Sequence, residues 1–252
     1  MGKRGQATIF IVLGILLVAI VVLYFVGVQT NVIPPLLTTS DAASELNDID
    51  SHVEECLEDV GMEYLNVIGI QGGYITTADD TFRLYNDTTV SYLCWNQQDS
   101  EACTNRLLTV SKMETQLEET LNIALQTCIN VYDYSKGVTV RDDWELDIQV
   151  NQETVDIDLF YPIEVIKGED SASEDEFSVT LDVPLGELYT VSQDIVNDHA
   201  VYGDFDPLLY MLSKLSKYTI YKNKPYPDTI YQVKMRENPY VFQFGIQGEP
   251  SV

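Results

Sequence analysis

Two histidines and an excess of carboxylates are the groups in this sequence best suited to catalysis or metal binding. His52 lies in an acidic stretch, where a solvated surface side chain is the favoured interpretation. His199 follows Asp198 at a predicted helix end, where the helix dipole stabilises an imidazolium. The sequence has no Gly-x-Ser-x-Gly elbow, His-Glu-x-x-His pair or Gly-x-x-x-x-Gly-Lys loop. We therefore predict a protein that is not an enzyme and has no catalytic residue, metal or cofactor.

The carboxylates leave one alternative open. Paired carboxylates hydrolyse glycosidic bonds, although no particular pair stands out among 40 acidic residues. The alternative function is therefore a tethered extracellular hydrolase that acts through an acidic site. Carboxylates also bind hard cations, but EF-hand spacing is absent from the four aspartates considered, Asp156, Asp158, Asp204 and Asp206.

The four cysteines predict two disulfide bonds and an oxidising environment. Cys56 and Cys128 fall on the apolar stripes of two predicted helices, where they can face each other, and Cys94 and Cys103 flank a polar segment. The pairing that fits these elements is Cys56 with Cys128 and Cys94 with Cys103. The alternative for Cys56 and Cys128 is a pair of buried thiols. Zinc is less favoured, because the closely spaced cysteine pairs of zinc sites are missing.

Hydrophobic periodicity predicts the helices that position these residues. From Asp41, apolar residues recur every three or four positions until the glycines at 69, 72 and 73, and eight acidic residues lie between Asp41 and Asp59. This pattern predicts a long amphipathic helix. A second helix is expected to open at Ser111, with Glu114 completing a capping box.

The period changes to two between Val138 and Val183, which predicts strands. We expect a hairpin of 144–150 and 155–159, an acidic loop at 169–176 and a strand at 177–183. Helical spacing returns at 185–196 and after Asp206-Pro207, and strands are expected near 218–221, 229–235 and 240–246. The predicted fold is α+β, with residues 41–252 forming one domain in which two early helices pack on an antiparallel sheet.

The N-terminus predicts a membrane anchor. Residues 7–28 are 22 consecutive uncharged positions, 16 of them Ile, Leu, Val or Phe. A helix of this length is roughly 33 Å long, enough to cross a hydrocarbon core of about 30 Å. Lys3 and Arg4 precede the segment, so residues 1–6 are expected in the cytoplasm and the domain outside. Pro34-Pro35 marks a hinge in the linker at 29–40. A cleaved secretory leader is disfavoured, because the apolar core is too long and no Ala-x-Ala site follows it.

The residues around Gly5 resemble a known processing signal. Lys3-Arg4-Gly5-Gln6 before an apolar helix is similar to the archaeal class III signal peptide of type IV pilin-like proteins. The resemblance implies that a prepilin-type membrane peptidase cuts between Gly5 and Gln6 and leaves the helix attached. Segments 53–57, 70–75 and 225–231 also resemble uncharacterised archaeal surface proteins that have this N-terminus.

One position departs from the pilin pattern. Phe10 stands where pilins usually have a Glu that is thought to align subunits during assembly. Without that charge nothing polar draws the helix from lipid. We therefore predict a monomeric or weakly associated tethered domain rather than a filament subunit.

The net charge of the chain limits the classes of partner that it can bind. The formal net charge is −26, which excludes binding to a nucleic-acid backbone. Acidic residues on every predicted polar face favour a protein adapted to concentrated salt, and an ordinary acidic surface or loose calcium binding is the alternative. Asn86, in Asn86-Asp87-Thr88, is a predicted N-glycosylation acceptor.

These observations predict a single-pass cell-membrane protein with a cytoplasmic N-terminus and an extracellular domain. Its expected role is structural or in cell contact. Its expected partners are the lipid bilayer and other surface or pilus proteins.

Overall fold

The computed structural model describes residues 41–96, 103–133, 136–141 and 143–248, and residues from Ala42 onward form one compact unit. The predicted cytoplasmic N-terminus at 1–6, membrane helix at 7–28 and linker at 29–40 lie outside the described residues. None of the described helices is both long enough and apolar enough to cross a bilayer.

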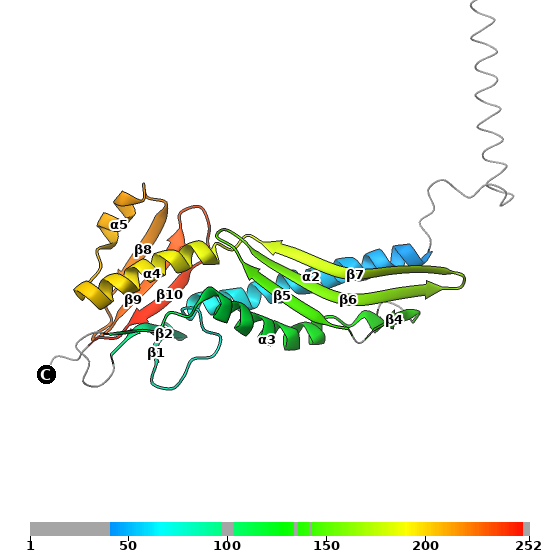
Figure 1. The fold of residues 1–252 in the computed structure, drawn as a ribbon, viewed down its shortest axis with the longest axis horizontal. Coiled ribbons are helices and arrows are strands. Elements are labelled where there is room, and N and C mark those ends of the chain that lie inside the picture. The colour runs from blue at the N-terminus through cyan, green and yellow to red at the C-terminus, as the bar shows by residue number, and fades with distance from the viewer. Residues whose placement is uncertain (1–40, 97–102, 134–135, 142, 249–252) are drawn as a thin grey trace, which may run out of the picture. The chain divides into compact units, whose positions relative to one another are not determined.

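The described domain is α+β, as predicted, with helices packed on two sheets (Figure 1). The long helix α2 (Asp41–Ile70), the first of the described helices, ends where expected. Gly72 and Gly73 adopt positive φ angles of 71° and 90°, and the Gly73 amide donates to the Ile68 carbonyl at 2.7 Å, so the glycines close the helix. The other helical elements are α3 (Val110–Cys128), the 3-10 turn η1 (Val131–Asp133), α4 (Leu185–Tyr202) and α5 (Pro207–Ser213).

The first sheet has six strands in the order β1-β2-β10-β9-β8, with β3 beside β2. The predicted single antiparallel sheet is wrong here, because β2 and β10 run parallel. Their segments are far apart in sequence, so no local pattern announced the pairing. The strands are β1 (Phe82–Tyr85), β2 (Thr88–Trp95), β3 (Thr104–Asn105), β8 (Tyr218–Asn223), β9 (Thr229–Met235) and β10 (Phe242–Ile246).

The second sheet has four antiparallel strands, with β4 and β5 on one side of β6 and β7 on the other. The predicted hairpin is confirmed, but the predicted loop at 169–176 is wrong. Residues 170–176 belong to β7, which pairs with β6 as far as Lys167 and Asp170, and Gly168 at φ 63° and Glu169 form the turn between the two strands. Backbone pairing makes this polar segment a strand. The strands are β4 (Val138–Val140), β5 (Glu145–Val150), β6 (Val155–Lys167) and β7 (Asp170–Leu181).

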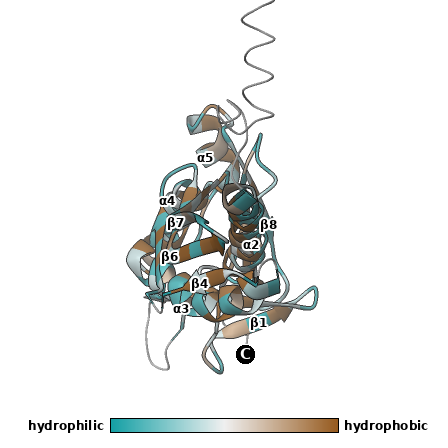
Figure 2. Cartoon of the chain, turned by 90° about the vertical axis from the view of Figure 1, so that its right-hand side faces the viewer, coloured by the Kyte–Doolittle hydropathy of each residue, from teal (hydrophilic) through white to brown (hydrophobic). Residues whose placement is uncertain are grey.

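One hydrophobic core joins the helices and both sheets. A Cβ at Gly61 of α2 would lie 2.6 Å from Ile157 in the four-stranded sheet, and one at Gly69 would lie 2.7 Å from the Val241 carbonyl beside β10. α2 therefore packs closely against both sheets, and Figure 2 shows brown, hydrophobic segments in this interior. The described core residues all lie between Ala42 and Ile246, within the compact unit that begins at Ala42.

Both predicted disulfides are present. Cys56 of α2 is bonded to Cys128 at the end of α3, with 5.9 Å between the Cα atoms, and Cys94 of β2 is bonded to Cys103. The first bond joins two helices across 72 residues, and the second links two cysteines nine positions apart. Two disulfides in one domain indicate a secreted or extracellular environment.

The start of α3 differs from the predicted capping box. Thr109 is the N-cap, and its hydroxyl accepts a hydrogen bond from the Lys112 amide at 3.3 Å. Glu114 instead reaches the edge of β5, where its carboxylate accepts from the Val150 amide at 2.9 Å, and Glu118 accepts from the Ile148 amide at 3.4 Å. These carboxylates satisfy amides on the outer edge of β5 that would otherwise be open to pairing.

Candidate functional site

The residues predicted for processing and modification have different outcomes. Gly5 and Gln6 lie outside the described residues. Asn86 is exposed at the tip of the β1–β2 hairpin, where Asn86 and Asp87 have positive φ angles of 50° and 62°. Asn and Asp tolerate this conformation and are typical of two-residue hairpin turns. The side chain is displayed to solvent, and its glycosylation stays a prediction.

The four aspartates considered as cation ligands are mostly engaged in other interactions. Asp156 accepts from the Thr180 hydroxyl at 2.8 Å and the Asn151 amide at 2.7 Å, and Asp206 caps α5. Asp204 forms an ion pair with Lys222, which lowers the pKa of the Asp204 carboxyl. Across the described ranges, no group of three or more His, Cys, Asp and Glu side chains has a geometry that suits a metal ion.

Carboxylates do gather on the outer face of the four-stranded sheet. A hollow of about 480 Å³ is lined by Glu145, Asp147, Asp158 and Glu176, all exposed. Asp147 and Asp158 are direct cross-strand partners. The general acid of a glycosidase usually sits in a partly apolar environment, whereas these carboxylates face solvent. The hollow therefore offers a solvated acidic surface.

The two histidines are more enclosed than predicted. His52 is partly buried, with Nε2 3.7 Å from the Cys56 sulfur. His199 Nε2 lies 2.8 Å from the Tyr231 hydroxyl. Burial and then the Lys222 ammonium lower the pKa of His199 below its ordinary value. His199 does lie in the last turn of α4, and this lowered pKa disfavours the cation predicted there.

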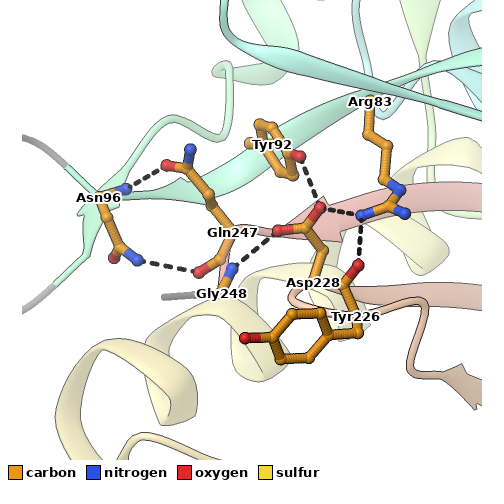
Figure 3. Close-up of polar contacts among 7 residues, drawn as sticks. All are labelled: Arg83, Tyr92, Asn96, Tyr226, Asp228, Gln247 and Gly248. Carbon is orange, nitrogen blue, oxygen red and sulfur yellow. Dashed lines mark hydrogen bonds and ion pairs between the residues drawn. The ribbon is translucent and has the colours of Figure 1, made fainter. Parts of the chain in front are cut away.

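A buried polar cluster around Asp228 joins the edge of the six-stranded sheet to its centre (Figure 3). The Asp228 side chain is 4% exposed, and its carboxylate forms an ion pair with Arg83 of β1. It also accepts hydrogen bonds from the Tyr92 hydroxyl at 2.8 Å and the Gly248 amide at 2.9 Å. Burial and the Asp228 carboxylate raise the pKa of Tyr92 well above its ordinary value, so the phenol stays a donor.

This cluster connects segments that are distant in sequence. The Asn96 amide donates to the Gln247 side-chain oxygen at 2.9 Å, which extends the network from the end of β2 to the residues after β10. Both Asp228 oxygens accept hydrogen bonds or pair with a cation, so the carboxylate is internally satisfied. A satisfied buried carboxylate of this kind is suited to holding strands together.

The surface that stands out is built on α5. Asp206 caps this helix by accepting from the Leu208 and Leu209 amides at 3.0 and 3.1 Å, and Pro207 occupies its first turn. One side of α5 packs inward: the Tyr210 hydroxyl donates to Asp194 of α4 at 2.8 Å. The Ile220 amide of β8 lies 3.3 Å from the Met211 sulfur.

The other side of α5 is apolar and exposed. Leu208, Leu209 and Leu212 are 61–67% exposed, and Leu215, just after the helix, is 93% exposed. Val201 and Tyr202 at the end of α4 are 71% and 78% exposed. We call these six residues the α5 face. Both views place α5 at the periphery of the domain (Figure 1) (Figure 2). Exposed apolar residues concentrated in one segment indicate a contact surface.

Backbone strain accompanies this exposure. Leu215 and Ser216 have positive φ angles of 52° and 59°, which is unusual for a bulky residue. The Ser216 amide donates to the Met211 carbonyl at 2.8 Å and holds the turn. Strain retained beside exposed leucines is typical of functional surfaces.

An ion pair and a hydrogen bond anchor the C-terminal end of the α5 face. Lys217 Nζ lies 3.0 Å from the Glu187 carboxylate of α4, and the Tyr218 hydroxyl donates to the same carboxylate. Burial alone would raise the pKa of Glu187, but these two donors and nearby lysines lower it overall. The segment that carries the leucines is therefore fastened to α4 at its C-terminal end.

Sequence analysis missed this surface because its leucines have the same helical spacing as core residues. The distribution of charged residues along the sequence does set this segment apart. Residues 207–248 contain six basic and two acidic residues, whereas residues 41–206 contain six basic and 37 acidic residues. The C-terminal segment thus differs in charge from the rest of the domain.

Comparisons of the chain with family models, with curated proteins and with solved structures find no match. The fold and disulfides define an α+β domain suited to an oxidising, extracellular environment. Within the described residues, its most distinctive surface is the α5 face.

Proposed function

We propose that the chain is a membrane-anchored extracellular surface protein with a non-catalytic, structural or cell-contact role. One observation carries the proposal: four leucines of one short segment are 61–93% exposed on a domain that otherwise presents a strongly acidic surface. Apolar surface is costly to leave in water, and a contact that removes it from water is favourable. The α5 face is the proposed contact surface.

The N-terminal sequence supports the anchoring part of the proposal. Residues 7–28 have the length and composition of a membrane helix, and Lys3 and Arg4 favour a cytoplasmic start. The resemblance to class III signal peptides adds cleavage between Gly5 and Gln6 by a prepilin-type peptidase. Mass spectrometry of the chain from cells that have this peptidase should find Gln6 first. A start at Met1 or Gly2 contradicts the processing, and a start near Asn31 contradicts the anchor.

Footprinting of intact cells tests the contact role. A small carbene or hydroxyl-radical reagent labels exposed side chains of the anchored full chain on cells and of dilute purified domain 41–252. We expect at least about threefold less labelling of Leu208, Leu209, Leu212 and Leu215 on cells, because a contact excludes reagent and water from buried apolar groups.

Ile123 of α3 is the internal control, because it is 73% exposed and belongs to another element. Its labelling should be equal on cells and in dilute solution. Equal labelling of the leucines in both samples would contradict a contact role for the α5 face.

A further inference from the structure

A second surface feature of the domain has the chemistry to receive the α5 face. A groove of about 460 Å³ lies between the C-terminal half of α2 and the segment before β10. We call it the α2 groove. Most of its lining is apolar, and the residues that matter here are Met62, Ile70, Asp182, Val183, Pro239 and Val241.

The walls of the α2 groove are fixed by internal hydrogen bonds. The Tyr240 hydroxyl donates to the Leu65 carbonyl of α2 at 2.7 Å, and the Tyr240 amide donates to the Asn238 side chain at 2.9 Å. The Asn238 side chain in turn donates to the Asp182 carbonyl at 3.1 Å. A groove held in this way is formed before anything binds, which lowers the entropic cost of binding.

The charges around the two surfaces are complementary. The α5 face has exposed lysines, Lys214 and Lys217, at its C-terminal end, and exposed Asp206 and half-buried Asp198 lie at its N-terminal end. Charged residues of both signs also lie in or near the α2 groove. Asp182 lines it, Glu63 is exposed next to Met62, and Arg236 is exposed two residues before Asn238.

This divided charge argues against an anionic lipid surface as the occupant of the α5 face. A lipid surface presents one sign of charge to the whole face, so the aspartates at one end would be repelled while the lysines were attracted. A protein surface with carboxylates for the lysines and one cation, Arg236 beside exposed Glu237, for Asp206 can match both ends.

We propose that the α5 face of one copy of this chain docks in the α2 groove of a second copy. This inference rests on the proposed contact function and names its partner. Each copy then contributes two different surfaces, so the contact is heterologous. The leucines enter the apolar lining, Lys214 faces Asp182 and Glu63, and Asp206 at the other end of the α5 face meets Arg236.

Both surfaces lie on a strongly acidic domain, so the contact is expected to be weak at low salt. The long-range repulsion between copies falls as salt shortens the Debye length to about 3 Å at 1 M, while the apolar contact persists. Self-association should therefore strengthen with salt. Binding to anionic lipid would weaken with salt.

Mixing two variants tests the heterologous contact. The sample is domain 41–252, which contains the complete described core and both disulfides, in 1 M NaCl at up to millimolar concentration. Sedimentation equilibrium should detect association of the unchanged domain. Leu212→Glu breaks the α5 face and Ile70→Glu breaks the α2 groove, and each should weaken self-association by at least about tenfold. Ile123→Glu is the matched control and should associate like the unchanged domain.

An equimolar mixture of Leu212→Glu and Ile70→Glu should restore association as pairs and no larger species, because one variant supplies the groove and the other supplies the α5 face. Thermal melting checks that all variants are folded. Failure of the unchanged domain to associate, or of the mixture to pair, would overturn the second-copy proposal.

Binding to vesicles of phosphatidylcholine and phosphatidylglycerol at 3:1 tests whether lipid covers the α5 face instead. Binding that Leu212→Glu abolishes and Ile70→Glu preserves, without pairing in the mixture, would identify lipid as the occupant instead. If protection of the leucines on cells persists while self-association fails, the contact role stands and only the partner is wrong. If that protection is absent, the contact role itself fails.

Discussion

The two sheets of the domain accommodate their carboxylates in different ways. On the four-stranded sheet, Glu145, Asp147, Asp158 and Glu176 line one exposed hollow, and Asp147 faces Asp158 directly across the strands. Like charges in this position are destabilising, and only solvent and salt reduce the repulsion. This face is therefore sensitive to its surroundings.

The six-stranded sheet instead contains a buried carboxylate with its own partners. Asp228 is 4% exposed and is satisfied by Arg83, Tyr92 and the Gly248 amide. A buried charge needs such partners because it has lost its water. One acidic chain therefore relies on solvent for one set of charges and on internal pairing for another.

Removing a disulfide should have the largest effect on stability, and the two bonds should differ in the size of that effect. Cys56→Ser with Cys128→Ser opens a 72-residue loop between the helices, and loop entropy predicts a loss of about 4 kcal/mol. Cys94→Ser with Cys103→Ser opens a nine-residue separation beside β3 and should cost about 3 kcal/mol. Urea unfolding of both double variants measures the difference. A larger loss for the second pair would contradict the ranking.

Asp228→Asn tests internal pairing in the six-stranded sheet. The substitution leaves Arg83 partly buried without its counter-charge, and we expect the free energy of unfolding to fall by about 3 kcal/mol. Asp175→Asn is the matched control, because Asp175 and Arg141 form an exposed pair at 3.4 Å that should contribute less than about 1 kcal/mol. Similar losses for both variants would show that burial does not set the contribution of these pairs.

Local patterns predicted much of this architecture. The stripe of α2, the alternation of β5 and β6, and the Asp206-Pro207 start of α5 each depend on neighbours in sequence, and the structure confirms them. Both disulfides followed because Cys56 and Cys128 occupied stripes that had to face the same core.

The remaining features depend on distant partners. Asp228 and Arg83 are 145 residues apart, and neither has a sequence context that points to the other. The polar half of β7 pairs through its backbone, so its Ser and Glu residues looked like a loop. The α5 leucines have the spacing of core residues, and only tertiary packing decides that Tyr210 and Met211 turn inward while the leucines do not.

Asp158→Asn tests solvent-dependent charge on the four-stranded sheet. Removing one of two facing carboxylates should stabilise the domain by up to about 1 kcal/mol at low salt. The gain should disappear in 1 M NaCl, where the Debye length is about 3 Å. Asp156→Asn on the same face is the control, because Asp156 accepts hydrogen bonds from Thr180 and Asn151 and its substitution should bring no gain. Thermal melting of both variants at low salt and in 1 M NaCl measures these effects. A lower melting temperature for Asp158→Asn than for the unchanged domain at low salt would contradict repulsion between Asp147 and Asp158.

The smallest expected effect is the pH dependence contributed by His199, which again concerns internal pairing. The ring faces Tyr231 of β9 and Lys222 of β8, with Asp198 and Asp204 nearby. Burial and Lys222 lower the pKa of His199 in the folded domain below its ordinary value of 6.5. Below pH 6.5 the unfolded chain therefore takes up a proton before the folded domain does, and stability falls as pH falls through the lowered pKa.

His199→Gln keeps a polar partner for Tyr231 and removes this titration. We expect the free energy of unfolding of the unchanged domain to decline between pH 7 and pH 5 relative to that of His199→Gln, measured in urea at fixed ionic strength. His52→Gln is the matched control, because His52 lies beside the Cys56 sulfur and apart from the Tyr231 cluster, and it should keep the decline. Carboxylates such as Glu187 and Asp204, whose pKa values are lowered, lose their stabilising effect only at more acidic pH. If the free energies of unfolding of the unchanged domain and His199→Gln change in parallel with pH, His199 has the same pKa in the folded and unfolded states. Asp228 and its partners would then be the remaining example of internal pairing.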